Sequence, residues 1–282
     1  MRTVAIVGAG DIGSACAQAL AARDCVGHVV LIDRASAAAA GKALDIRQSG
    51  AITGFHTRIG GTDDWTAVAG CAVCVIADRF AADSPEWHGE EGLSLIRQLL
   101  SACGDAPIVF AGVKQSDLLL ATVREARVDR RRVMGSSPDA FGAAVAAIVG
   151  MEAGCSPVEV SLAVLGVPPT SFVIPWSDAS IGGYSLERTL SQAQLGRIEA
   201  RAARLWPPGP FALGAAAART VEGLIDSARR SHNLLAVLDG EFGVRGRLGV
   251  VPARLGPAGI VRTAAPSLNT RERVRLETAL GG

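Results

Sequence analysis

The sequence lacks several features that would place it in a specialised class of protein. No apolar run approaches the roughly 20 residues that a membrane-spanning helix requires. The net charge of +1 provides no surplus of one sign for binding nucleic acid or an anionic membrane. The first residues carry one arginine and a short apolar run that glycines interrupt, whereas a secretory signal has a longer apolar region. We therefore expect a cytoplasmic protein without nucleic-acid or membrane partners.

Cysteine patterns that would indicate metal or redox chemistry are also scarce. Cys71 and Cys74 form a C-x-x-C, a spacing that can serve either purpose. They lie, however, in CAVCVIA, which is typical of a buried strand, and no second pair is near. Because free cysteine packs as a small apolar side chain, we interpret the pair as structural and expect no metal site.

The first half of the chain alternates strand-like and helix-like segments. The composition, 49% hydrophobic and 20% charged over 282 residues, is that of a globular protein with a large core. Short β-branched runs alternate with stretches whose apolar residues are three and four positions apart. The runs are TVAIVGAG, HVVLIDR, CAVCVIA, PIVFAGV and RRVMGSS. This alternation predicts an α/β fold, a parallel sheet with helices on both faces.

The second half has a different pattern. VEVSLAVLG and TSFVIPWS are expected to be strands, and SLERTLSQAQLGRIEARAARLW one helix that ends before Pro207 and Pro208. FALGAAAARTVEGLIDSARR is expected to be a second long helix, whose small alanine face suits close packing. NLLAVLDGEFGV, RLGVVPARLGPAGIV and a final charged helix complete an α+β unit. We place a dinucleotide-binding domain at residues 1–138 and a smaller α+β domain at 139–282, with the boundary near Pro138.

The strongest motif is a dinucleotide-binding fingerprint. Gly8, Gly10 and Gly13 form G-x-G-x-x-G between a strand and a helix, where the helix N-terminus and the absent side chains suit a pyrophosphate. Asp33 ends the next strand, 20 residues beyond Gly13, where a carboxylate would bind both ribose hydroxyls. It favours NAD, although the adjacent Arg34 leaves NADP open. The predicted cofactor contacts are Gly8, Gly10, Asp11, Ile12, Gly13, Asp33, Arg34 and Ala77.

These motifs resemble those of the lactate/malate dehydrogenase family over essentially the whole chain. GAGDIG, LIDR and GKALDIRQ resemble its cofactor turn, ribose-binding strand end and following helix. LLAVLDGEFGV and RLGVVPARLGPAGIVR resemble two of its later strands, and FALGAAAARTVEGLI resembles the helix before them. The resemblance implies a Rossmann domain, a smaller catalytic domain, and a homodimer or homotetramer.

The resemblance also shows what the family's active site has lost in this sequence. The family's proton-accepting histidine stands between two glycines, and this chain has Val167, Pro168 and Pro169 there. The family's Asp-x-x-Arg, which orients the histidine and binds the substrate carboxylate, is reduced to Asp139 because Gly142 replaces the arginine. Lys114 stands where the family has an asparagine near the nicotinamide.

The loop that follows CVIA has also changed character. The family's loop carries two substrate-binding arginines, whereas DRFAADSPEWHGEEG has one, Arg79, and is acidic. The acidic side chains are Asp78, Asp83, Glu86, Glu90 and Glu91. Such a loop would repel a carboxylate and attract a cationic amine or imine. Alternatively, it is a solvated loop whose acids favour the N-terminus of the helix that follows.

Three residues remain as candidates for proton transfer: Lys114, Asp139 and His88. A buried Lys114 would have a lowered pKa suited to an acid, but it can equally cap a strand and pair with Asp117. For the histidines, including His232, a surface or packing role is the default.

Three functions follow. The favoured one is an NAD(H)-dependent oxidoreductase of a small molecule other than a hydroxy acid, such as a cationic imine or amine. The second is an inactive dinucleotide-binding subunit or scaffold, and turnover would distinguish the two. The third, a malate or lactate dehydrogenase with relocated catalytic groups, is the least favoured because neither base nor carboxylate clamp is visible.

Overall fold

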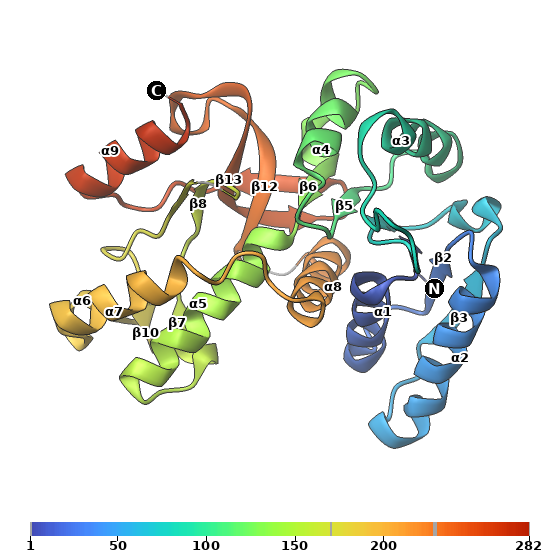
Figure 1. Cartoon of the computed structure of the whole chain (residues 1–282), viewed down its shortest axis with the longest axis horizontal. Helices are drawn as coiled ribbons and strands as arrows, with labels where there is room; N and C mark the ends of the chain where they lie inside the picture. Colours follow the sequence, from blue (N-terminus) through green and yellow to red (C-terminus); the bar gives the residue numbers. More distant parts are fainter. Residues whose placement is uncertain (1, 170, 228–229, 282) are drawn as a thin grey trace.

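The computed structural model describes residues 2–169, 171–227 and 230–281. These residues build one large mixed sheet with helices on both sides (Figure 1). In spatial order its strands are β3 (Arg58–Thr62), β2 (His28–Ile32), β1 (Thr3–Val7), β4 (Val73–Ile76), β5 (Ile108–Phe110), β6 (Val133–Gly135), β12 (His232–Asp239), β13 (Arg245–Gly256), β8 (Leu165–Val167) and β9 (Ser171–Val173), and β14 (Gly259–Thr263) also pairs with β13. A small second sheet holds β11 (Tyr184–Ser185), β10 (Ser180–Ile181) and β7 (Val160–Ser161).

The helices follow the predicted alternation in the first half and gather around the sheet's extension in the second. They are α1 (Asp11–Arg23), α2 (Ser36–Thr53), α3 (Gly89–Cys103), α4 (Ser116–Arg124), α5 (Ser137–Ala153), α6 (Leu186–Thr189), α7 (Gln192–Ala202), α8 (Pro210–Asp226) and α9 (Thr270–Ala279). Alternate residues of β1 enter opposite cores, Val4 and Ile6 on one face and Ala5 and Val7 on the other. Burial on both faces explains why this strand reads as a continuous apolar run.

The parallel half of the sheet fixes where a ligand can sit. From β3 to β6 every neighbouring pair is parallel, in the order β3-β2-β1-β4-β5-β6. The order reverses between β1 and β4, and ligands of such sheets bind at the carboxyl ends of the strands beside this reversal. The predicted α/β fold is therefore confirmed, and the sheet places the ends of β1 and β4 at the expected binding edge.

The edge strand β3 is absent from the sequence-based prediction. Its sequence, RIGGT, contains two glycines and has little of the apolar pattern that marks the other strands. The packing of α2 accounts for one of them, because a Cβ on Gly61 would collide with the backbone of Ala39. Close approach of a helix thus requires the residue type that hides the strand from a propensity-based prediction.

The sheet continues without interruption into the second half of the chain. Leu235 of β12 pairs antiparallel with Gly135 of β6, which joins residues of both predicted domains in one sheet. Pro138, the predicted boundary, lies in the first turn of α5. Helix α8 packs on α1, where a Cβ on Gly214 would collide with Ala15, and the alanines Ala216, Ala217 and Ala218 of α8 are buried. The predicted close packing of this helix is confirmed.

One predicted helix is wrong in its extent. The segment that begins at Ser185 was expected to form a single helix, but it divides into α6 and α7. Ser191 begins the second helix, because its hydroxyl accepts a hydrogen bond from the amide of Gln194 and the Gln194 side chain accepts one from the amide of Ser191. This reciprocal capping competes successfully with continuation of the helix. Similarly, VEVSLAVLG forms two short strands, β7 and β8, in different sheets.

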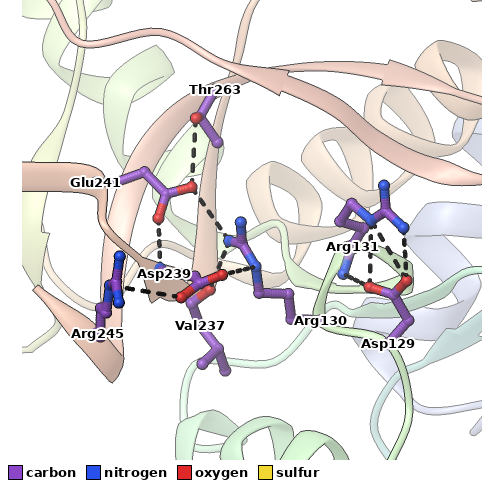
Figure 2. Close-up of polar contacts among 8 residues, drawn as sticks. All are labelled: Asp129, Arg130, Arg131, Val237, Asp239, Glu241, Arg245 and Thr263. Atoms are coloured by element: carbon purple, nitrogen blue, oxygen red, sulfur yellow. Dashed lines mark hydrogen bonds and ion pairs between the residues drawn. The ribbon is translucent and has the colours of Figure 1, made fainter.

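A polar cluster fastens the hairpin between β12 and β13 to the turn before β6 (Figure 2). Arg130 donates to the carboxylate of Glu241 over 3.1 Å and to the carbonyl of Val237 over 3.1 Å. Glu241 also accepts hydrogen bonds from the amide of Asp239 and the hydroxyl of Thr263. Burial opposes its charge, but these hydrogen bonds and Arg130 hold the pKa of Glu241 below its usual value of 4.5. The cluster therefore links the two halves of the chain through an ionised glutamate.

Candidate active site

The glycine loop is shaped by crowding between β1, α1 and the end of β4. Gly8 has φ of +108°, a conformation that favours glycine, and a Cβ there would collide with the carbonyl of Asp78. A Cβ on Gly13 would collide with the carbonyl of Gly8. The G-x-G-x-x-G spacing thus corresponds to a tight turn and a close helix–strand contact, as the fingerprint predicts.

Asp33 ends β2 beside this loop and is 5% exposed. Its Oδ2 accepts hydrogen bonds from the amide nitrogens of Ala9 (2.8 Å) and Phe80 (3.0 Å), and its Oδ1 accepts one from the amide of Ala35 (3.0 Å). The carboxylate therefore ties together the glycine loop, its own strand end and the acidic loop after β4. Arg34 points to the same loop, with its guanidinium 3.9 Å from the carboxylate of Glu91.

The N-terminus of α1 already holds an anion, the carboxylate of Asp78. Its Oδ2 accepts from the amide of Asp11 (2.9 Å) and its Oδ1 from the amide of Gly13 (3.0 Å). Its main-chain carbonyl accepts from the amide of Gly10 (2.8 Å), and a Cβ on Gly10 would collide with the Asp78 carboxyl group. Free amides at a helix N-terminus after a glycine turn are the donors that bind a pyrophosphate. The donor set therefore suits a phosphate, and here an internal carboxylate uses it.

The side chain of Glu86 contacts the turn that follows β5, much as Asp78 contacts the turn that follows β1. Asp78 and Glu86 pair across an antiparallel bridge, so the segment 78–86 is a small hairpin. The Glu86 carboxylate accepts from the amide of Lys114 over 2.7 Å, and a Cβ on Gly112 would collide with it. Burial raises the pKa of Glu86, although the amides of Lys114 and Val113 oppose the shift. Two carboxylates of one hairpin thus contact the carboxyl edge of the sheet.

The structure places two of the predicted proton donors around Glu86. Lys114 is exposed, so the burial on which its role as a proton donor depends is absent. Among the described residues no ion pair joins it to Asp117 either. His88 is also exposed, and its Nδ1 lies 3.0 Å from the carbonyl of Glu86.

The remaining acids of the loop are mostly paired. Glu91 accepts a hydrogen bond from Arg79 over 2.8 Å, and Glu90 accepts one from Arg97 over 2.9 Å. Arg79 also stacks on Trp87, which is buried. With Asp78 and Glu86 bound to backbone amides, Asp83 is the acid of this loop for which the described residues supply no hydrogen bond or ion pair. The loop is therefore less available to a cationic ligand than its composition suggests.

Asp139 belongs to a separate cluster at the end of β6. Its Oδ1 accepts from the amide of Asn233 over 3.1 Å, and its side chain is 4% exposed. Within the described residues its Oδ2 has no hydrogen-bond partner. Two bases approach that oxygen, Arg219 at 3.6 Å and His232 at 3.8 Å. The histidine beside Asp139 comes from the start of β12, whereas the family's histidine was sought in the segment after β8.

His232 is the residue that sequence reasoning missed. Its ring is 2% exposed, and neither nitrogen has a hydrogen-bond partner in the described part of the chain. A Cβ on Gly223 of α8 would collide with this ring, so the glycine makes room for it. The antiparallel pairing of β12 with β6 brings His232 to Asp139, and no local motif signals that pairing.

A cavity of about 920 Å³ opens beside Asp139. Its charged lining residues are Asp139, Asp178, Arg219 and Arg230, and Asn233 lines it beside them. Gly142 also lines it, at the position where the resemblance implies a carboxylate-binding arginine, and a Cβ there would lie 3.1 Å from the side-chain Nδ2 of Asn233. The cavity therefore presents both an acidic and a basic group to a small molecule.

Comparison with known proteins identifies the family. Residues 2–98 match the description "lactate/malate dehydrogenase, NAD binding domain". The chain is 29% identical to a malate dehydrogenase of Dehalococcoides mccartyi (strain CBDB1), over 99% of this chain and 96% of the relative. The structure of malate dehydrogenase from Salinibacter ruber superimposes with a TM-score of 0.88 at 25% identity, over 99% of this chain and 94% of that one. This chain belongs to the lactate/malate dehydrogenase family.

The family assignment confirms several sequence-based predictions. The Rossmann fold and NAD as the cofactor are those predicted from the glycine loop and Asp33, and the chain stands among the NAD-dependent dehydrogenases of this family. A malate dehydrogenase of Cytophaga hutchinsonii is 28% identical over 98% of this chain and 94% of its own length. Across residues 2–169, 171–227 and 230–281, no helix has the length and apolar character needed to cross a membrane.

The cysteine pair lies where a structural role was predicted. Cys74 is inside β4 and Cys71 is just before it, and both are buried. Burial raises the pKa of the Cys71 thiol to about 12 and that of Cys74 well above its usual value. Because the thiolate is the form that binds metals and attacks disulfides, these cysteines are held in the unreactive form.

Proposed function

We propose that this chain is an NAD(H)-dependent oxidoreductase that acts on a small molecule other than a 2-hydroxy acid, with a cationic imine or amine as the substrate class. The observation that carries the proposal is the buried Asp139 carboxylate beside the cavity, with one oxygen free of hydrogen bonds from the described residues. A buried carboxylate is stabilised by a partner of opposite charge. Arg219 lies 3.6 Å from this oxygen without a hydrogen bond to it, and a protonated imine or amine in the cavity would supply a hydrogen-bonded partner of opposite charge.

The glycine loop and Asp33 are the residues that would hold the cofactor. The amides of Asp11 and Gly13 would bind the pyrophosphate, and Asp33 would bind the adenosine ribose. NAD, when bound, supplies the hydride-transfer chemistry. The residues at the carboxyl edge orient the substrate, and Asp139 holds its positive charge.

Oxidation of a 2-hydroxy acid needs a base and a carboxylate-binding group, and this chain has neither at the positions that the resemblance indicates. Pro168 has no basic side-chain group, so it cannot accept the proton of a hydroxyl group. Gly142 has no side chain, so it cannot form the two parallel hydrogen bonds by which arginine grips a carboxylate. Arg219 and Arg230 line the same cavity and could bind a carboxylate on a substrate that also carries a cationic nitrogen.

An activity survey tests the proposal. Initial rates of NAD reduction and NADH oxidation would be measured with amines, cyclic imines and keto compounds, with malate and lactate as references. We expect turnover with a cationic nitrogen compound, and we expect Asp139→Asn to raise KM for it. Asp178→Asn is the matched control, because Asp178 lines the cavity but is exposed. Turnover that Asp139→Asn leaves unchanged would overturn the assignment of Asp139.

A second candidate is an inactive dinucleotide-binding subunit. The amides of Asp11 and Gly13 form a phosphate cradle that the Asp78 carboxylate fills, and this favours the scaffold form of the candidate, since a chain that retained the fold alone has no need to keep the cradle open. Dinucleotide binding without turnover on the whole panel would support this candidate. For either function we propose a homodimer or homotetramer in the cytoplasm, which light scattering on the purified protein and localisation of the tagged chain would test.

A further inference from the structure

We propose that Asp78 is the residue that sets the affinity and the charge selectivity of the dinucleotide site. Its carboxylate binds the same helix N-terminal amides that a pyrophosphate would use, so the two anions exclude each other. The inference rests on the proposed dinucleotide-dependent function. It deepens that function by naming the group that must leave before the cofactor binds.

The contacts of Asp78 make the exclusion specific. The carboxylate lies 2.9 Å from the amide of Asp11 and 3.0 Å from that of Gly13, and the residue is 8% exposed. Hydrogen bonds from amides to an ionised carboxylate are among the stronger ones in proteins. A pyrophosphate cannot approach these amides without breaking both hydrogen bonds. If the Asp78 carboxylate stayed in place, its negative charge would repel the pyrophosphate.

The hairpin that carries Asp78 provides a way out of the site. Glu86, the bridge partner of Asp78, is attached to the turn after β5 by its own carboxylate. The amide of Phe80 is held by Asp33, and the Phe80 ring lies 5.2 Å from the ammonium of Lys42. Arg79 also donates to Glu91 over 2.8 Å, and the Asp78 carbonyl accepts from the amide of Gly10 over 2.8 Å, whereas the tip of the hairpin, residues 80–85, is largely exposed. Departure of Asp78 from the amides of Asp11 and Gly13 would open the cradle for the pyrophosphate.

Lys42 favours an anion once the hairpin has left. Its ammonium donates to the carbonyl of Gly10 over 3.2 Å and lies 3.8 Å from the carboxylate of Asp11. The ammonium of Lys42 therefore lies at the glycine loop while the Asp78 carboxylate occupies the cradle. Exchange of the Asp78 carboxylate for a pyrophosphate replaces one negative charge with two beside this lysine, which strengthens the attraction.

The test compares ligands with and without the pyrophosphate. NADH, ADP-ribose and adenosine would be titrated by calorimetry into the wild type, Asp78→Asn, Asp78→Ala and the control Asp83→Asn. Asp83 lies in the same loop and is exposed, so its substitution changes the charge without touching the cradle. We expect both Asp78 variants to bind NADH and ADP-ribose at least about tenfold more tightly, because two charge-assisted hydrogen bonds no longer have to be broken. Adenosine affinity and the Asp83 variant should stay within about twofold of the wild type.

A second readout follows the hairpin itself. Trp87 is buried at its base under Arg79, so its fluorescence reports hairpin release. NADH absorbs light in the range of tryptophan emission, so ADP-ribose, which is not fluorescent, is used as the ligand. A Trp87→Phe variant shows which part of the signal comes from Trp87. We expect ADP-ribose to change Trp87 emission in the wild type, and the Asp78 variants to show part of that change without ligand.

The outcomes separate this inference from the proposed function. Tight NADH binding that is equal in the wild type and the Asp78 variants would overturn the role of Asp78 and leave the oxidoreductase proposal standing. No NADH binding by any folded variant would overturn both. Equal gains for adenosine and ADP-ribose would also overturn the role of Asp78, because a carboxylate that competes with pyrophosphate cannot affect a ligand that lacks one.

Discussion

The imidazole of His232 lies beside the carboxylate of Asp139, with 3.8 Å between Nδ1 and Oδ2, and both side chains are buried. The distance is too long for a hydrogen bond, and the described residues give the ring no other partner. Each buried polar group that lacks a partner destabilises the fold by about 1–3 kcal/mol. The burial of this pair beside the candidate substrate cavity therefore lowers the stability of the fold.

We predict that His232→Leu leaves the free energy of unfolding unchanged or raises it by about 1 kcal/mol, because it removes buried nitrogens without hydrogen bonds at similar volume. Urea denaturation would measure the change. A loss of more than about 2 kcal/mol would contradict the prediction and indicate that a charged His232 stabilises Asp139.

Asp33→Ala should lower the free energy of unfolding by about 3 kcal/mol, because three backbone amides lose a carboxylate acceptor. It should also weaken NADH binding, since the ribose would lose its acceptor. Asp83→Ala in the neighbouring loop is the control and should leave both quantities nearly unchanged. Thermal denaturation with and without NADH would measure both effects, and a stable variant that binds NADH normally would refute the assigned role of Asp33.

Glu86→Gln should stabilise the protein at neutral pH. Burial raises the pKa of Glu86 above its usual 4.5, so the folded state binds the proton more tightly than the unfolded state. The contribution of Glu86 to stability is then favourable below pH 4.5 and is lost as the pH rises through the raised value. The stabilising effect of the amide should accordingly disappear as the pH falls below 4.5, which melting curves at several pH values would reveal. An effect that does not depend on pH would contradict this account.

Arg130→Ala should cost about 1–2 kcal/mol of stability, because Glu241 and the Val237 carbonyl lose a half-buried donor. Arg131→Ala is a matched control: its partner Asp129 is exposed, and exposed pairs contribute at most about 1 kcal/mol (Figure 2). Because the pKa of Glu241 is lowered, the difference between wild type and Arg130→Ala should be present above pH 4.5 and lost as the pH falls through the lowered value. Equal losses for the two variants would show that the cluster has no special role.

The features that the sequence could predict are those that depend on neighbouring residues. The glycine loop and Asp33 follow from the spacing of residues in one strand–turn–helix–strand unit, and the alternation of strands and helices predicts the parallel sheet. The two-domain division stays a prediction, since the sheet itself runs through the proposed boundary.

The features that the sequence could not predict depend on contacts between distant segments. Asp78 lies 65 residues from Gly13, and only the order of β1 and β4 in the sheet brings its carboxylate to the helix N-terminus. His232 reaches Asp139 through the pairing of β12 with β6. A signal for the first contact existed, because Asp78 directly follows the apolar run whose end borders the cofactor loop in this fold. None existed for the second.

A calorimetric titration of the purified protein with NADH, in the presence and absence of malate or lactate, tests the proposed function most directly. We predict that NADH binds, and that neither hydroxy acid changes its affinity, because Pro168 and Gly142 offer no base and no carboxylate clamp. Malate that alters NADH binding and is then oxidised with NAD at about 1 to 1,000 turnovers per second would contradict the account, as would the absence of any NADH binding.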